Sequence, residues 1–288
     1  MTSRFALVLG GGGVAGIAWE TGVLVGLADA GVDVLGADLI VGTSAGSAVT
    51  AQLGSGLPLE DLFRRQVDPA LQAREIPADL DLTDYARTIG EILAGAEDVA
   101  EIRRRIGTWA GEVRTVPEKK RREAVASRLP SFDWPERPIA IVAVDAETGE
   151  RRIFGPESGV GLVDAVTASC AVPGIWPPVS IGDRRYVDGG VHSSENADLA
   201  LGYDRVLVLS PMSAGTPAPP WGGTLEENVE QLRRRGSTVT VIHPDEASLT
   251  AMGPNPLDPS VREVSAQAGR AQGRREAGRT ADGWRSAG

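Results

Sequence analysis

Histidine, cysteine and basic charge are all scarce in this chain of 288 residues, which has two histidines and one cysteine. The single cysteine, Cys170, excludes an internal disulfide framework and lies in an apolar helical pattern, so we expect a buried structural thiol. A net charge of −10 argues against nucleic-acid binding and against charge-driven adhesion to anionic membranes. No apolar run approaches the length that spans a bilayer. These absences predict a cytoplasmic protein without a nucleic-acid partner, whose contact with membranes would be transient and peripheral.

Glycine and proline are frequent, with 36 and 19 copies, and hydrophobic residues make up 42% of the chain. This composition supports a real core and predicts many tight turns. Apolar runs at 5–9 and 37–41 predict buried strands, and the patterns at 14–30 and 45–53 predict helices. The alternating order predicts a parallel sheet with right-handed crossovers.

The remainder of the chain continues this pattern after one interruption. Residues 58–130 are charged, helical in pattern and poor in strand signals. We predict further strands at 138–144, 151–154, 184–187, 205–209 and 239–242, and helices at 161–171 and 225–235. The sequence therefore predicts an α/β fold with a mostly parallel central sheet flanked by helices. We expect it over residues 1–258, with a helical insertion at about 58–130 and a C-terminal helical tail at 259–288.

A serine stands between the second predicted strand and the helix that follows it, in Gly42-Thr43-Ser44-Ala45-Gly46. The G-x-S-x-G pattern is typical of a sharp turn that exposes a nucleophilic hydroxyl above a helix N-terminus. The free N–H groups at such a terminus favour developing negative charge. A tight turn of small residues that closes a helix onto a sheet without any chemistry is the alternative interpretation.

A glycine cluster after the first strand has two interpretations. Residues 11–16 fit G-x-G-x-x-G, and Asp33 follows about twenty residues later, as in a dinucleotide-binding unit. The same loop could instead present backbone N–H groups to a tetrahedral oxyanion. Because the chain continues from Asp33 into the serine turn, the second interpretation is favoured: Ser44 would attack, and Gly12, Gly13 and the N–H of Ala45 would receive the oxyanion.

A nucleophilic serine needs a base, and the sequence offers three candidates. His192 would complete a triad with Asp188, and His243 follows a predicted strand. Alternatively, Asp188 itself could accept the proton from Ser44. A free aspartate is a weak base near neutrality, and burial beside apolar groups would raise its pKa and improve the match. We expect His192 to be a bystander.

Three motifs together resemble the patatin-like phospholipase family: Gly11 to Gly16, Gly42 to Gly46, and the turn at Asp188. The approach to that turn, Ala168 to Pro178 and then Tyr186 to Gly190, is also similar to the family. The resemblance implies acyl-ester hydrolysis of lipid substrates through an acyl-enzyme, with a serine–aspartate dyad and neither metal nor cofactor. It implies that Ser44 is the nucleophile and Asp188 the base, that Gly11, Gly12, Gly13 and Ala45 form the oxyanion hole, and that Gly16, Gly42, Gly46, Gly189 and Gly190 support these motifs.

The chain departs from the family pattern at Ala15, where the family commonly has arginine or lysine. Preference for a charged phospholipid head group is therefore less secure, and a neutral acyl ester remains open. The basic clusters at 103–105 and 119–122 fit either a solvated helical face or a cap over the active site with affinity for anionic head groups. A nicotinamide-dependent oxidoreductase and a catalytically silent scaffold are the rival functions.

Overall fold

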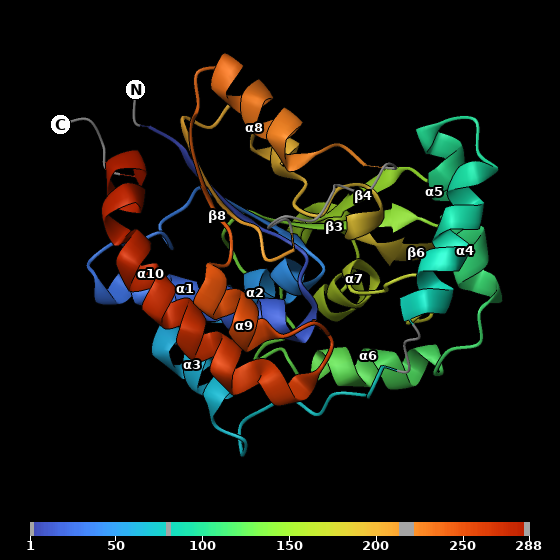
Figure 1. The fold of residues 1–288 in the computed structure, drawn as a ribbon, viewed down its shortest axis with the longest axis horizontal. Coiled ribbons are helices and arrows are strands. Elements are labelled where there is room, and N and C mark those ends of the chain that lie inside the picture. Colours follow the sequence, from blue (N-terminus) through green and yellow to red (C-terminus); the bar gives the residue numbers. More distant parts are fainter. Residues whose placement is uncertain (1–2, 79–81, 213–221, 285–288) are drawn as a thin grey trace.

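An eight-stranded mixed sheet organises the structure, a computed structural model that describes residues 3–78, 82–212 and 222–284 (Figure 1). The strand order is β5-β6-β3-β2-β1-β7-β8, with β4 also paired to β3. Strands β1, β2, β3, β7 and β8 run parallel, whereas β4, β5 and β6 join by antiparallel pairs. Their bounds are β1 Phe5–Leu9, β2 Leu39–Thr43, β3 Ile139–Asp145, β4 Arg151–Phe154, β5 Val179–Ile181, β6 Arg184–Asp188, β7 Arg205–Leu209 and β8 Thr238–Ile242.

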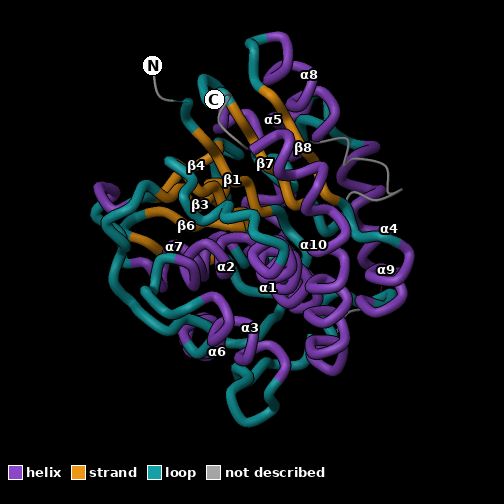
Figure 2. Tube along the Cα trace, turned by 90° about the vertical axis from the view of Figure 1, so that its left-hand side faces the viewer, coloured by secondary structure: helices purple, strands orange, loops and turns teal. Residues whose placement is uncertain are grey.

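Helices cover both faces of this sheet. Their bounds are α1 Gly13–Asp29, α2 Ala45–Leu53, α3 Leu59–Val67, α4 Leu82–Ala94, α5 Val99–Glu112, α6 Glu118–Ala126, α7 Leu162–Ser169, α8 Leu225–Arg234, α9 Glu246–Met252 and α10 Arg262–Trp284. The predicted α/β class is confirmed, and the expected insertion consists of α3 to α6. Figure 2 shows α1 and α10 side by side on one side of the strands, with α8 on the other. None of the described helices is both long and apolar enough to cross a bilayer.

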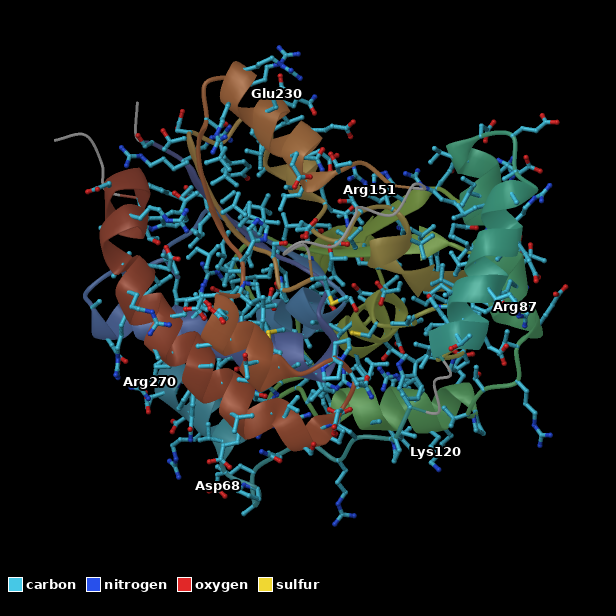
Figure 3. The ribbon with its side chains drawn as sticks, in the orientation of Figure 1. Asp68, Arg87, Lys120, Arg151, Glu230 and Arg270 are labelled. Atoms are coloured by element: carbon cyan, nitrogen blue, oxygen red, sulfur yellow. The ribbon has the colours of Figure 1, made fainter. Side chains whose placement is uncertain are left out.

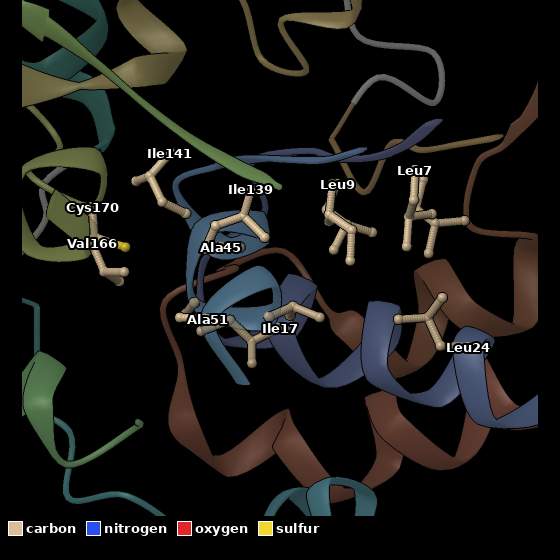
Figure 4. Close-up of a cluster of buried hydrophobic side chains, with 14 of the residues drawn as sticks. Leu7, Leu9, Ile17, Leu24, Ala45, Ala51, Ile139, Ile141, Val166 and Cys170 are labelled. Atoms are coloured by element: carbon tan, nitrogen blue, oxygen red, sulfur yellow. The ribbon is translucent and has the colours of Figure 1, made fainter. Parts of the chain in front are cut away.

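The core forms because alternate residues of the strands point to opposite faces. On one face, Leu7 and Leu9 of β1 and Ile141 of β3 pack with α1, α2 and α7 (Figure 4). On the other face, Val8 and its neighbours pack against α8. Val144 of β3 belongs to that second face and meets α4 and α5. The two parallel-strand faces are therefore both buried, as the continuous apolar runs in the sequence predicted.

The segment after residue 258 is a long helix that packs closely along α1. A Cβ added at Gly22 would lie 2.1 Å from the carbonyl oxygen of Ala266, and one added at Gly26 would lie 2.1 Å from that of Arg270. Such separations are too short for any side chain, so glycine allows the two helices to touch. The sequence predicted the helix, whereas its place beside α1 appears only in the structure.

Candidate active site

Ser44 occupies a strained turn between β2 and α2. Its φ and ψ are 52° and −114°, a conformation that non-glycine residues seldom adopt. A Cβ added at Gly46 would lie 2.1 Å from the carbonyl oxygen of Leu9, so only glycine allows α2 to approach β1 this closely. Gly42 likewise allows β2 to lie close to α2, since a Cβ added there would meet the Thr50 hydroxyl at 2.5 Å. The local structure therefore matches the turn that the sequence predicted.

The register of β3 brings Asp188 to this turn. Val142 of β3 pairs with Thr43 at the end of β2, and the next residue, Ala143, pairs with Asp188 at the end of β6. Strand β4 pairs with both of these β3 residues and so occupies the opposite edge. Strands β2 and β6 therefore lie along the same edge of β3 with their carboxyl ends meeting. Gly189 makes this contact close, since its added Cβ would lie 2.4 Å from the Val142 carbonyl oxygen.

Residues at the end of α7 form hydrogen bonds with both the Ser44 turn and Asp188, a feature that the sequence did not reveal. The Ser169 hydroxyl accepts a hydrogen bond of 2.9 Å from the Ser44 N–H. The Cys170 thiol donates to the Ser44 carbonyl at 3.1 Å, and the Ala171 carbonyl accepts from the Asp188 N–H at 3.0 Å. Cys170 is buried, as expected of a structural thiol. Three consecutive residues thus fix the positions of Ser44 and Asp188 relative to each other.

The Asp188 carboxyl group is buried and only partly hydrogen-bonded. Its Oδ1 accepts from the Gly190 N–H at 2.8 Å, whereas Oδ2 has no partner with ordinary hydrogen-bond geometry among the described residues. Burial raises the pKa of Asp188 to about 6, against the opposing effects of the Gly190 N–H, the Ser44 hydroxyl and the Arg121 charge. The Ser44 hydroxyl and this carboxyl group belong to residues that line the same cavity. A carboxyl with this pKa is a far better base near neutrality than a solvated aspartate.

Several backbone donors of the glycine loop and of α2 are available at the same place. Within the described chain, the N–H groups of Gly12, Gly13 and Ala45 have no acceptor, because Gly13 and Ala45 begin helices. The Gly11 N–H, by contrast, donates to the Ser194 carbonyl at 2.9 Å, so it is not one of these unpaired donors. Gly11 still shapes the site, since its added Cβ would lie 3.6 Å from that of Ser44.

These groups face a cavity of about 400 Å³ whose lining is mainly apolar. Ser44, Asp188 and Gly11 to Gly13 form one part of its wall, beside the loops at the carboxyl ends of β1 and β2. The helical insertion forms another part through Tyr85, Ile106 and Arg121. Figure 1 shows α4, α5 and α6, the source of these side chains, gathered at one end of the sheet. The insertion therefore contributes to the wall of the cavity.

The basic cluster at 119–122 divides between solvent and this cavity. Lys119 and Lys120 are exposed, and Lys120 lies at the outer edge of α6 (Figure 3). Arg122 is paired with Asp164 on the surface. Arg121, in contrast, is only 2% exposed and lines the cavity, with its guanidinium carbon 3.9 Å from the centre of the Trp176 ring. The interpretation as a solvated helical face does not hold for Arg121, because Arg121 lies on the buried face of α6 together with Ala124 and Val125.

The remaining candidates lie elsewhere. His192 is not among the described residues that line the cavity, and burial lowers its pKa to about 4, which leaves the imidazole neutral. Asp33 lies beyond the far end of α1, a 17-residue helix about 25 Å long, and accepts a local hydrogen bond from the Leu35 N–H. One ligand cannot therefore reach both Asp33 and the glycine loop as a dinucleotide would. No cluster of three potential metal ligands occurs in the described ranges.

Comparisons with known proteins found curated relatives of similar sequence, several solved structures and one family model. An NTE family protein of Mycobacterium tuberculosis (strain CDC 1551 / Oshkosh), itself uncharacterized, is 31% identical over 186 residues, which are 64% of this chain and 26% of that protein. A protein of Mycobacterium bovis from the same family matches to the same extent. The chain thus spans about a quarter of the length of these relatives.

Among solved structures, VipD from Legionella pneumophila has a TM-score of 0.49 at 13% identity, with 96% of this chain and 67% of that chain covered. ExoU, in its complex with SpcU from Pseudomonas aeruginosa, has a TM-score of 0.41 at 20% identity, with 94% and 52% covered. The family model described as patatin-like phospholipase matches residues 7–201, which is more than half of the chain. The chain therefore belongs to the patatin-like phospholipase family.

Proposed function

We propose that this chain is a serine acyl-ester hydrolase of the phospholipase A or lysophospholipase type, acting on lipid esters. The observation that carries the proposal is the convergence of the strained Ser44 turn, a buried carboxyl with a pKa of about 6, and unpaired backbone N–H groups on one cavity. Family membership supports the same reaction class. The cavity volume of about 400 Å³ is within the usual range of about 300–1,000 Å³ for small-molecule sites.

In the proposed reaction, Asp188 accepts the proton of the Ser44 hydroxyl as its oxygen attacks the ester carbonyl. The N–H groups of Gly12, Gly13 and Ala45 stabilise the negative charge on the tetrahedral oxygen. The carbon–oxygen bond to the alcohol then breaks, and Asp188 returns the proton to the leaving alcohol. A water molecule then attacks the acyl carbonyl while Asp188 again accepts the proton. The bond to the Ser44 oxygen breaks, the acid leaves, and Asp188 returns the proton to Ser44.

A fluorophosphonate probe and p-nitrophenyl esters of several chain lengths test this proposal. We expect the probe to label Ser44 and the Ser44→Ala variant to lose both labelling and ester hydrolysis. Ser180 is exposed and outside the cavity, so Ser180→Ala is the matched control and keeps both signals. A folded Ser44→Ala variant that hydrolyses the esters at the wild-type rate would exclude the proposed nucleophile.

A further inference from the structure

Arg121 is an unusual group to find inside an apolar cavity. Its Nε and Nη1 atoms are buried and have no hydrogen-bond partner among the described residues. The Nε1 of Trp176, the ring on which the guanidinium stacks, is also buried without a partner in the described chain. Both side chains line the cavity that contains Ser44 and Asp188. Two side chains in contact on the cavity wall therefore carry buried hydrogen-bond donors that have no acceptor in the described chain.

Neither acidic group near Arg121 supplies the missing acceptor, since Asp188 acts on Arg121 through its charge and not through a hydrogen bond. Glu75 is paired with Arg128 at 2.6 Å and with Arg262 at 2.5 Å, so one carboxylate serves two other guanidinium groups. Burial, and then the charge of Arg128, lower the pKa of Arg121 to about 9, which still leaves it cationic near neutrality. A buried cation without a bonded partner is costly to the fold, and an anionic ligand would offset that cost.

We propose that Arg121 and the Trp176 N–H form the subsite for an anionic head group, so that Arg121 sets the preference of the enzyme for a phosphate-bearing over a neutral acyl ester. This inference rests on the hydrolase function proposed above and assigns a specificity-determining residue to it. A guanidinium is a planar fork of N–H donors that suits the oxygens of such an anion, and its carbon lies 3.9 Å from the centre of the Trp176 ring, which restrains its position.

The position of this cation bears on Ala15, which stands where the family commonly has arginine or lysine. Ala15 is fully buried in α1 and brings no charge to the site. The cation on the cavity wall comes instead from α6, about one hundred residues later in the chain. A neutral residue at position 15 is therefore compatible with a charged head group.

A pair of substrates that differ only in the head group tests the subsite. The full chain is assayed for fatty-acid release from a monoacylglycerol and from its phosphate ester with the same acyl chain. The pH is about 8, where a carboxyl with a pKa of about 6 is ionised, so that loss of the Arg121 charge does not act through Asp188. We expect wild-type protein to prefer the phosphate ester in kcat/KM.

The ratio of kcat/KM for the phosphate ester to that for the neutral ester is the decisive quantity. We expect Arg121→Gln to lower this ratio by about 10- to 100-fold, as expected for hydrogen bonds to a charged group. Arg121→Lys should restore part of it, because lysine keeps the charge but not the fork. Lys120→Gln removes one charge from the exposed side of the same helix and should leave the ratio unchanged.

A binding measurement separates failure of this inference from failure of the hydrolase proposal. Calorimetric titration of the Ser44→Ala chain uses an ether-linked alkylglycerol phosphate and the matching alkylglycerol, with and without Arg121→Gln. Tighter binding of the phosphate that depends on Arg121 supports the subsite even if hydrolysis is not detected.

The subsite would be overturned if wild type and Arg121→Gln had equal ratios of kcat/KM and bound the ether-linked phosphate equally tightly. The proposal of a hydrolase would be unaffected by that result. Inorganic phosphate is titrated as a separate arm. If it binds as tightly as the ether lipid and with the same dependence on Arg121, the ligand is free phosphate and the head-group assignment is wrong.

Discussion

Replacing Asp188 by asparagine should change activity and stability in opposite directions. The Asp188 side chain is 5% exposed, and burial raises its pKa from 3.8 to about 6. Each pKa unit corresponds to about 1.4 kcal/mol, so the folded protein prefers the neutral carboxyl by about 3 kcal/mol. Ionisation of this group, which proton transfer from Ser44 requires, therefore weakens the fold.

The sign of the pH dependence follows from the raised pKa. Below pH about 4, the carboxyl is protonated in both the folded and the unfolded chain, and it costs nothing. As the pH rises from about 4 to about 6, the unfolded chain releases the proton first, so the free energy of unfolding falls by up to about 3 kcal/mol and then stays level. Activity should follow the opposite course, with kcat/KM rising tenfold per pH unit up to about 6 and then levelling off.

The Asp188→Asn variant should lose the contribution of Asp188 to both dependences. Asparagine can still accept the Gly190 N–H through its side-chain oxygen, so the local structure is retained. We expect its free energy of unfolding to exceed that of wild type near pH 7 by up to about 3 kcal/mol and to match it near pH 4. Its kcat/KM should fall by roughly 10²- to 10⁴-fold, the usual contribution of a general base.

Two measurements check this prediction. Urea denaturation at several pH values gives the free energy of unfolding, and p-nitrophenyl ester hydrolysis in quenched samples gives kcat/KM. Asp183→Asn removes an exposed carboxylate outside the cavity and is the control for a loss of charge alone. A folded Asp188→Asn variant with wild-type kcat/KM would refute the reasoning. So would a wild-type kcat/KM that does not change between pH about 5 and about 7.

Three further predictions concern residues around the site. His192→Ala should keep at least half of the wild-type ester hydrolysis, since this histidine lies outside the cavity lining, and a loss as complete as that of Ser44→Ala would replace the dyad by a triad. Glu20 is fully buried without a hydrogen-bonded partner for its oxygens in the described chain, and burial raises its pKa well above 4.5. Its raised pKa makes wild-type stability fall as the pH rises above about 4.5, and Glu20→Gln should reduce that fall in denaturation curves without loss of stability at neutral pH. Gly46→Ala should cost about 1–3 kcal/mol or more in the same denaturation assay, because its Cβ would meet the Leu9 carbonyl at 2.1 Å, and unchanged stability would contradict the close packing of α2 on β1.

Elements defined by local patterns were predicted closely from the sequence. The strand at 205–209 and the helix at 45–53 have the predicted bounds, and Ser44 lies in a turn between a strand and a helix, where its φ is positive. Short elements were missed: β5 has only three residues and α9 only seven, too few for a hydrophobic period to emerge. Proline and glycine are frequent at 211–223, a composition that predicts a loop, and most of this stretch lies outside the described residues.

The sequence by itself determined the fold class, the family and the residue types at the site, because strand runs, helical periods and glycine turns act through neighbours in the chain. Only the tertiary structure decided which distant residues meet. Ser44 and Asp188 come together because β2 and β6 pair with adjacent residues on one edge of β3. Arg121 reaches the cavity because α6 lies across it, whereas the sequence shows only a basic cluster. Register and burial depend on the whole sheet and its insertion, so no local pattern encodes them.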